Sequence, residues 1–266
     1  MTHTQKPSRI VQKYWNRAVI TWASWWIGRE CSVQLAQQWY NIIAVARDHT
    51  KLSQLQHELQ SAYHITCKII SADLSTTIWI DSVITCCDTH DVGIAVMNAG
   101  FGTSGAFDQS QISKEVNMLQ LNCISTLQLT HYFVQKFVPQ HRWAIVLLSS
   151  ILAFQWTAYS ANYAATKAYI QTLWEWLAQE LQWSWVDILT VAPWPVDTWF
   201  SGTAQMTFGR SADVSDVVRD ILWSLGQTTF VYPWLLSKLI WYSLALLPRR
   251  AKSKVMKMVM KSMIQH

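Results

Sequence analysis

Tyr163 and Lys167 lie four residues apart in "YAATK", the spacing that places two side chains on one face of a helix. An ammonium group beside a phenol stabilises the phenolate, so we expect Lys167 to lower the pKa of Tyr163 from about 10 toward neutrality. Such a tyrosine can protonate a carbonyl oxygen as hydride arrives, or act as a base in the reverse direction. Taken alone, an ordinary helix surface pair explains this spacing at least as well.

Ser150 ends the apolar stretch "AIVLLSS" and lies 13 residues before Tyr163. Its hydroxyl would hydrogen-bond the same substrate oxygen, where negative charge develops during the reaction. A serine, a tyrosine and a lysine in this order therefore form a candidate site for proton transfer to a carbonyl group.

Seven apolar, β-rich stretches alternate with helix-period segments, which predicts crossover units and a parallel sheet covered on both faces. We expect one α/β domain over residues 1–233, a doubly wound (Rossmann) fold with a seven-stranded parallel sheet. A basic, amphipathic helical tail over residues 234–266 follows, either within this domain or as an extension facing a membrane or a partner. The predicted strands are residues 17–21, 42–46, 65–70, 92–97, 144–148, 186–191 and 229–232.

The turn after the first predicted strand reads "TWASWWIG", residues 21–28. Ligands of doubly wound sheets bind beyond the carboxyl ends of the strands, where glycine permits a tight turn and close approach to a pyrophosphate. The chain has 8 glycines and 17 tryptophans, whereas average usage predicts about 19 glycines in a chain of this length. These numbers are a first indication that tryptophan stands where glycine is expected.

With glycine in place of tryptophan, residues 21–28 become T-G-A-S-G-G-I-G, which is similar to the nucleotide-binding turn of the short-chain dehydrogenase/reductase family. The resemblance covers about residues 14–200 and, more loosely, the rest. It implies an NAD(P)-dependent oxidoreductase that transfers hydride between a nicotinamide and a carbonyl or alcohol. Met97 departs from the asparagine that is usual in the family. Further family motifs follow in the expected order, as "MNAG" (97–100), "LNCISTLQLT" (121–130), "LLSS" (147–150), "YAATK" (163–167) and "VAPWPVDTWF" (191–200).

The resemblance also implies roles that the residues alone do not give. Lys167 would contact the nicotinamide ribose, and Asn122 would hold a water molecule for proton relay. The candidate catalytic residues are therefore Asn122, Ser150, Tyr163 and Lys167.

The second predicted strand ends in "AVARDH", which favours NADP over NAD. Ala46 stands where an acidic residue would accept hydrogen bonds from the ribose of NAD, and Arg47 suits a 2′-phosphate; a solvated loop arginine is the alternative. By resemblance, Asp73 would hold the adenine edge, Asn98 would brace the adenine side and Thr198 would bind the carboxamide. The candidate cofactor-binding residues are Thr21, Trp22, Ser24, Trp26, Ile27, Gly28, Arg47, Asp73, Leu74, Asn98, Ala99, Gly100, Tyr163, Lys167, Pro193, Trp194, Val196 and Thr198.

Tryptophan occupies several positions where the family has glycine, and three explanations remain open. A codon read as glycine in the cell, with UGA the natural candidate, has been rendered as tryptophan. Alternatively, the chain is a pseudoenzyme with a blocked nucleotide site that acts as a binding or scaffold protein, or the tryptophans were introduced deliberately. Only the first explains the count, the positions and the intact catalytic set together. The positions are Trp22, Trp26, Trp39, Trp143, Trp183, Trp185 and Trp194.

Apolar candidates for the substrate pocket indicate a small hydrophobic carbonyl or alcohol compound, such as a ketone, an aldehyde or an acyl-type substrate, although some of them would equally serve as core. Residues 201–210 are expected to form a lid, as loops after the sixth strand do in the family. The pocket candidates are Phe101, Ile151, Phe154, Tyr159 and Phe208.

The remaining expectations concern partners and location. After Asp220 the chain has seven cationic residues and no acidic one, which suits peripheral contact with the inner face of a membrane. The alternative is a helix that packs across the pocket or a subunit interface. No apolar run reaches the length of about 18 residues that a membrane span needs. Five cysteines without metal-ligand spacing indicate reduced thiols, a cytoplasmic location and no metal. We expect no nucleic-acid partner and a homodimer or homotetramer.

Overall fold

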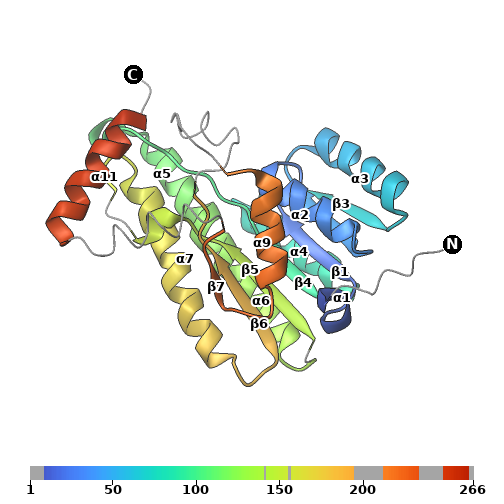
Figure 1. The fold of residues 1–266 in the computed structure, drawn as a ribbon. Helices are drawn as coiled ribbons and strands as arrows, with labels where there is room; N and C mark the ends of the chain where they lie inside the picture. The colour runs from blue at the N-terminus through green and yellow to red at the C-terminus, as the bar shows by residue number, and fades with distance from the viewer. Residues whose placement is uncertain (1–8, 141, 155–156, 195–211, 234–247, 264–266) are drawn as a thin grey trace.

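The computed structural model describes residues 9–140, 142–154, 157–194, 212–233 and 248–263. Its seven strands form one parallel sheet in the order β3-β2-β1-β4-β5-β6-β7, with helices on both faces (Figure 1). The predicted doubly wound α/β architecture is thereby confirmed. The strands are β1 (Arg17–Thr21), β2 (Asn41–Ala46), β3 (Cys67–Ser71), β4 (Ile94–Met97), β5 (Trp143–Leu148), β6 (Val186–Val191) and β7 (Phe230–Val231).

Helices and short helical turns connect successive strands. The π-helical segment η2 interrupts the long helix between β4 and β5, and two further segments, η1 and η3, are 3₁₀ turns. The helical elements are α1 (Arg9–Lys13), α2 (Trp26–Ala36), α3 (His49–Tyr63), α4 (Thr77–Asp88), η1 (Phe107–Gln109), α5 (Ile112–Leu119), η2 (Gln120–Ser125), α6 (Thr126–Phe137), η3 (Ile151–Phe154), α7 (Ala161–Glu180), α9 (Val214–Ser224) and α11 (Arg249–Met263).

The strand boundaries agree with the sequence prediction most closely where apolar runs have sharp polar ends. β1 and β6 have the predicted bounds, whereas β4 begins two residues later than predicted, at Ile94. The chain before β4 passes very close to a neighbouring backbone: a Cβ atom on Gly93 would lie 2.1 Å from the carbonyl oxygen of Trp15. Glycine is therefore required at this crossing.

Two hydrophobic clusters pack against opposite faces of the sheet, because strands buried on both faces expose apolar side chains on each. One cluster joins the sheet to α2, α3 and α9 and includes Leu35 and Ile221. The other joins it to α4, α6 and α7 and includes Phe133 and Ile170. The sheet thus forms the middle layer of three (Figure 1).

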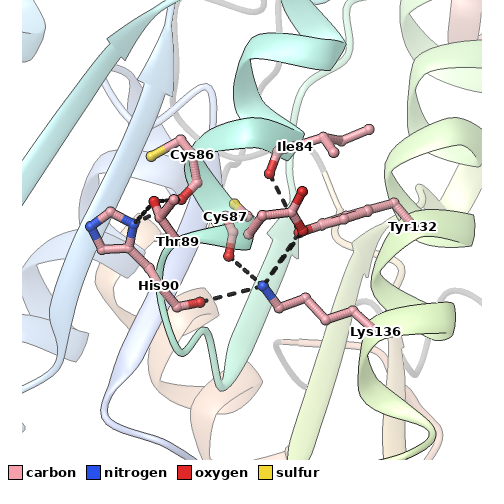
Figure 2. Close-up of polar contacts among 8 residues, drawn as sticks. Ile84, Cys86, Cys87, Thr89, His90, Tyr132 and Lys136 are labelled. Carbon is pink, nitrogen blue, oxygen red and sulfur yellow. Dashed lines mark hydrogen bonds and ion pairs between the residues drawn. The ribbon is translucent and has the colours of Figure 1, made fainter.

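The C-terminal end of α4 is fastened to α6 by a lysine (Figure 2). The ammonium group of Lys136 donates hydrogen bonds to the carbonyl oxygens of Cys87 and His90, at the end of the helix and just beyond it. The Tyr132 hydroxyl donates to Asp88 Oδ1 at 2.7 Å. These contacts lie at the α4 terminus and do not involve the candidate catalytic residues.

The predicted basic tail is seen in part, as helix α11; residues 234–247 lie outside the described part of the chain. Met256 and Met260 are buried, whereas Arg250, Lys254, Lys257 and Lys261 are exposed. Among the described helices, none is both long enough and apolar enough to cross a bilayer.

Candidate active site

The strand order reverses between β1 and β4, and the candidate site lies at the carboxyl ends of these strands. The buried hydroxyl of Thr21, at the end of β1, joins the two strands. It donates to the carbonyl oxygen of Val96 at 3.2 Å and accepts from the amides of Asn98 at 2.8 Å and Ala99 at 2.9 Å. Three of the predicted cofactor residues, Thr21, Asn98 and Ala99, are thereby brought together.

The turn between β1 and α2 confirms the need for at least one glycine. A Cβ atom on Gly28 would lie 2.3 Å from the carbonyl oxygen of Trp22 and 2.7 Å from Asn98 Nδ2. The same amide of Asn98 donates to the carbonyl oxygen of Thr21 at 3.2 Å. Helix, turn and β4 loop therefore approach too closely for any side chain at residue 28.

A cavity of about 560 Å³ opens beside the N-terminus of α2. Arg47, Asp73 and Ser24 line it as predicted for cofactor residues, and so do the side chains of Trp22 and Trp26. The carboxylate of Asp73 already accepts two hydrogen bonds from Ser75, at 3.0 Å from its amide and 2.8 Å from its hydroxyl.

The cavity fits the adenosine end of a dinucleotide better than its pyrophosphate. Arg47 and Asp73 supply a cation and a carboxylate at the ends of β2 and β3. The amides at a helix N-terminus bind phosphate groups. Here the cavity at that terminus is lined by three indoles, those of Trp22, Trp25 and Trp26. Helix α2 packs on β1 and β2 despite these side chains. With tryptophan at residues 22, 25 and 26, the turn does not fit a pyrophosphate.

The remaining predicted cofactor residues lie at the edge of this region or outside the described residues. Ile27 and Leu74 face the two hydrophobic clusters. The carbonyl oxygen of Pro193 accepts from the amide of Ile151 at 3.3 Å, and Trp194 is half-buried. The residues that lie outside are Val196, Thr198, Phe208 and the predicted lid 201–210.

Asn122 is held in the π-helical segment η2, a local widening of the helix that frequently marks functional sites. Its buried amide accepts from the amide of Phe101 at 3.1 Å and donates to the carbonyl oxygen of Phe101 at 2.9 Å. It also donates to the hydroxyl of Thr166 at 3.0 Å. The Asn122 side chain therefore joins the β4 loop to α7, which carries Tyr163 and Lys167.

Lys167 and Asn122 both approach Gly100 of the "MNAG" motif. A Cβ atom on Gly100 would lie 3.0 Å from Asn122 Oδ1 and 3.3 Å from Lys167 Nζ. The buried ammonium group donates to the carbonyl oxygen of Leu148 at 2.7 Å and lies 5.8 Å from the centre of the Tyr163 ring. Burial lowers the pKa of Lys167 to about 8.

The predicted pKa of Tyr163 is wrong in direction. Burial raises its pKa to about 12, because removing the phenolate from water costs more than the hydrogen bond from Ser150 returns. That hydrogen bond nevertheless joins the two hydroxyls for which the sequence predicted a common substrate oxygen. The structure thus brings Ser150, Tyr163, Lys167 and Asn122 into one buried site.

Sequence reasoning missed several residues around the site. Lys114 and Asn117 line the cavity from α5; their signal was two polar residues three apart, upstream of Asn122 on the same helical segment. On the other side, the ring of Phe154 lies 5.8 Å from those of Phe230 and Tyr232. The two β7-end aromatics carry no sequence signal beyond their strand.

Comparison with known proteins agrees with this geometry. The family described as short chain dehydrogenase matches residues 16–207, and the chain belongs to this family of oxidoreductases. A curated relative, 7beta-hydroxysteroid dehydrogenase from Mediterraneibacter gnavus, is 25% identical over 66% of this chain and 67% of its own length.

Two solved structures are also similar. A short-chain dehydrogenase from Sphingobium yanoikuyae in complex with NADPH is 25% identical, with a TM-score of 0.81 over 90% of this chain and 94% of its own. A bulky-bulky ketone specific alcohol dehydrogenase from Comamonas testosteroni is 27% identical, with a TM-score of 0.77 over 91% and 93%.

Proposed function

We propose that this protein is an NADP-dependent oxidoreductase that interconverts a carbonyl and an alcohol on a small hydrophobic substrate, with Tyr163 as general acid and base. The observation that carries the proposal is the buried hydrogen bond between Ser150 and Tyr163 beside the ammonium group of Lys167. When bound, the nicotinamide supplies or accepts the hydride.

The protein's own residues handle the proton and the developing charge. Because the pKa of Tyr163 is about 12, its phenol is protonated at neutral pH and is ready to donate to a carbonyl oxygen. The hydroxyl of Ser150 stabilises negative charge on that oxygen. Lys167, where protonated, stabilises the resulting phenolate. Asn122, fixed to Phe101 and Thr166, holds the water that returns a proton toward this group.

Arg47 supports NADP as the cofactor. It is exposed at the end of β2 and lines the cavity, and Ala46 before it has no carboxylate to repel a 2′-phosphate. Lys51, stacked 3.0 Å above the Trp25 ring, is a second cation nearby, and its ammonium group lies 3.7 Å from the carboxylate of Asp48, which also lines the cavity. The NADPH bound in the Sphingobium relative agrees with this choice.

A hydrophobic substrate is supported by aromatic residues that follow the site motifs in the chain. Phe154 of η3 follows Ser150 closely in the chain, and Phe101 follows the β4 motif. The relatives named for a 7beta-hydroxysteroid and for bulky ketones favour a bulky ketone. A 7-keto steroid and acetophenone are therefore suitable first probes.

We further propose that glycine occupies at least four of the tryptophan positions in the cell. Six non-glycine residues of the described chain have a positive φ, and four of them are tryptophan. Bulky residues are genuine outliers in this left-handed region, where glycine is at ease. The four are Trp22 (φ 53°), Trp26 (φ 45°), Trp39 (φ 60°) and Trp185 (φ 60°).

Nothing in the described catalytic set favours the pseudoenzyme alternative, because its four side chains keep their partners. The codons at these positions test the glycine proposal: UGA supports it, and UGG at Trp22 and Trp26 contradicts it. A chain with glycine at the four positive-φ positions is called the glycine form below.

The enzyme proposal is tested by following NADPH absorbance at 340 nm with the glycine form and the two probe ketones. We expect oxidation of NADPH with at least one ketone. Tyr163→Phe in the same form should reduce kcat by about 10²–10⁴-fold. NADPH should still bind this variant, as followed by quenching of the protein's tryptophan fluorescence. NADPH binding without turnover of any probe would contradict the proposed reaction, and turnover that Tyr163→Phe leaves unchanged would contradict the role of Tyr163.

Helix α11 supports contact with an anionic membrane surface. Arg250, Lys254, Lys257 and Lys261 follow one another at helical spacing and are exposed, whereas Met256 and Met260 of the same helix are buried. Each such cation contributes about 1 kcal/mol near an anionic bilayer. We expect the protein to float with phosphatidylglycerol-containing vesicles but not with phosphatidylcholine vesicles. Glutamine at the four cationic positions should abolish this flotation. Equal flotation of the protein and the glutamine variant would refute the proposal.

Assembly and location are proposed on similar grounds. Ile112, Val116 and Leu119 form an exposed apolar row on α5, which suits a homodimer or homotetramer. A monomer mass measured by light scattering at micromolar concentration would contradict this. Cys67 and Cys87 are unpaired, and burial raises the pKa of each thiol to about 12. Such inert thiols suit the reducing cytoplasm.

A further inference from the structure

Glu115 of α5 is a buried carboxylate that the proposed chemistry does not use. Among the described residues it is the only acidic residue that is buried, with 5% of its surface exposed. A buried carboxylate without a cationic partner costs stability unless hydrogen bonds satisfy its oxygens. No ion pair to Glu115 is found within the described part of the chain, so its hydrogen bonds indicate its purpose.

Both carboxylate oxygens accept hydrogen bonds from segments that border the catalytic site. Oε1 accepts from the hydroxyl of Thr103 at 2.9 Å, and Oε2 accepts from Nδ2 of Asn162 at 2.7 Å. The same Asn162 amide donates to the main-chain carbonyl of Glu115 at 3.2 Å. Thr103 lies in the loop after β4, and Asn162 directly precedes Tyr163.

Two further contacts fasten the same segments. The hydroxyl of Ser160 donates to the carbonyl oxygen of Thr103 at 2.9 Å, and the amide of Gly105 donates to the carbonyl oxygen of Tyr159 at 2.8 Å. Gly105 and Tyr159 both have positive φ, 126° and 65°. The loop and the start of α7 therefore follow specific backbone paths that these hydrogen bonds hold together.

The first turn of α7 relies on this anchor because its own cap is missing. Ser160, the N-cap residue, makes no side-chain capping bond to the helix, and its hydroxyl donates instead to the carbonyl oxygen of Thr103. The Asn162 side chain instead connects the first turn to the Glu115 carboxylate. A negative charge near a helix N-terminus is also favoured by the helix dipole.

Glu115 and Asn122 lie on one continuous helical segment and make parallel connections to α7. Glu115 holds Asn162 at 2.7 Å, and Asn122 holds Thr166 at 3.0 Å. Asn162 and Thr166 are one helical turn apart, and Tyr163 lies between them. The two connections thus fix α7 on either side of the residue that transfers the proton.

We propose that Glu115 is a positioning residue: its carboxylate fixes the first turn of α7 against the β4 loop and so sets the place of the Tyr163 hydroxyl. This inference rests on the proposed oxidoreductase function. It adds a residue that touches neither substrate nor cofactor and acts through Asn162 and Thr103.

The test exchanges donor and acceptor across the contact. Glu115→Gln leaves one acceptor oxygen for two donors, so either Asn162 or Thr103 loses its acceptor. Glu115→Gln combined with Asn162→Asp instead lets the new amide donate to the new carboxylate, while the amide oxygen still accepts from Thr103. In the glycine form, with NADPH and the better of the two probe ketones, the single variant should lower kcat about 10–100-fold, as sub-ångström to 1 Å misplacement does. The KM for NADPH should stay within about twofold, and the double variant should recover most of kcat. Glu180→Gln, at the exposed end of α7, is the matched control.

Equal losses of kcat in the single and double variants, or a loss of thermal stability with kcat per folded molecule unchanged, would overturn the proposal. A second measurement separates it from the enzyme assignment. By hydrogen–deuterium exchange, Glu115→Gln should speed exchange in the first turn of α7 but not in α4, and the double variant should reverse this. If the glycine form reduces no probe, the proposed function fails, while unchanged exchange in α7 would separately refute the role of Glu115.

Discussion

Replacing two exposed tryptophans by glycine should stabilise this protein, which is the opposite of what glycine usually does. Trp39 and Trp185 lie in turns, with 59% and 74% of their surfaces exposed, and both have a φ of 60°. Their indoles have little packing to lose. The left-handed backbone, in contrast, costs an L-residue with a bulky side chain roughly 1–2 kcal/mol.

The magnitude follows from two opposing terms. Relief of the left-handed backbone gains roughly 1–2 kcal/mol at each site, and the extra freedom of glycine in the unfolded chain returns about 0.5–1 kcal/mol. The double variant Trp39→Gly/Trp185→Gly should therefore be more stable by about 1–2 kcal/mol. For a domain of this size, that corresponds to a rise in Tm of about 2–8 °C.

Urea unfolding followed by circular dichroism at 222 nm is the suitable assay, because tryptophan fluorescence would change with the substitutions themselves. Trp176→Gly is the matched control: Trp176 is 67% exposed but lies within α7, where glycine should cost a few tenths of a kcal/mol. A double variant destabilised to the same degree as Trp176→Gly would refute the argument from backbone strain.

Three further predictions concern the site. Because the pKa of Tyr163 is about 12 and that of Lys167 is about 8, carbonyl reduction should be flat below about pH 7 and fall above about pH 8, where Lys167 loses the charge that stabilises the phenolate. Alcohol oxidation, which needs the phenolate, should rise with pH up to about pH 8. Steady-state rates of reduction that stay constant up to about pH 9 would contradict this. The pKa of Lys167 is lowered to about 8, so the unfolded chain binds more protons between about pH 8 and 10.5, and stability from this group rises with pH across that window. Lys167→Met should abolish activity. It should also remove a cost to the free energy of unfolding of about 3 kcal/mol at pH 7, partly offset by loss of the hydrogen bond to Leu148, and the urea midpoint should then no longer change between pH 7 and 9.5. An unchanged pH dependence of this midpoint would count against the prediction. Arg47→Asp should shift kcat/KM from NADPH toward NADH by at least about 100-fold, and an unaltered preference would show that Arg47 is only a solvated loop residue.

Much of the fold could be predicted because strand and helix periods are local properties of the sequence. The bounds of β1 and β6 follow from apolar runs alone. The meeting of Asn122 with Lys167 was predictable only through the order of motifs, since these residues are far apart in the chain. The family resemblance supplied that order.

Other properties depend on three-dimensional burial and could not be predicted. The direction of the Tyr163 pKa is set by desolvation, which spacing on a helix does not reveal. Glu115 looks like any polar residue of an amphipathic helix, because its partners Thr103 and Asn162 lie 12 and 47 residues away. Long-range partners of this kind leave no periodic signal.

The tryptophans in turns also bear on how the protein behaves in solution. Trp183, with 84% of its surface exposed, lies two residues from Trp185, and Trp39 is exposed elsewhere. Indoles displayed on exposed turns favour self-association. A gene with UGG at these positions should yield a poorly soluble protein, while a gene with glycine codons there should yield a soluble one. The soluble yields of these two genes therefore show which residue the exposed turns require before any enzyme assay is made.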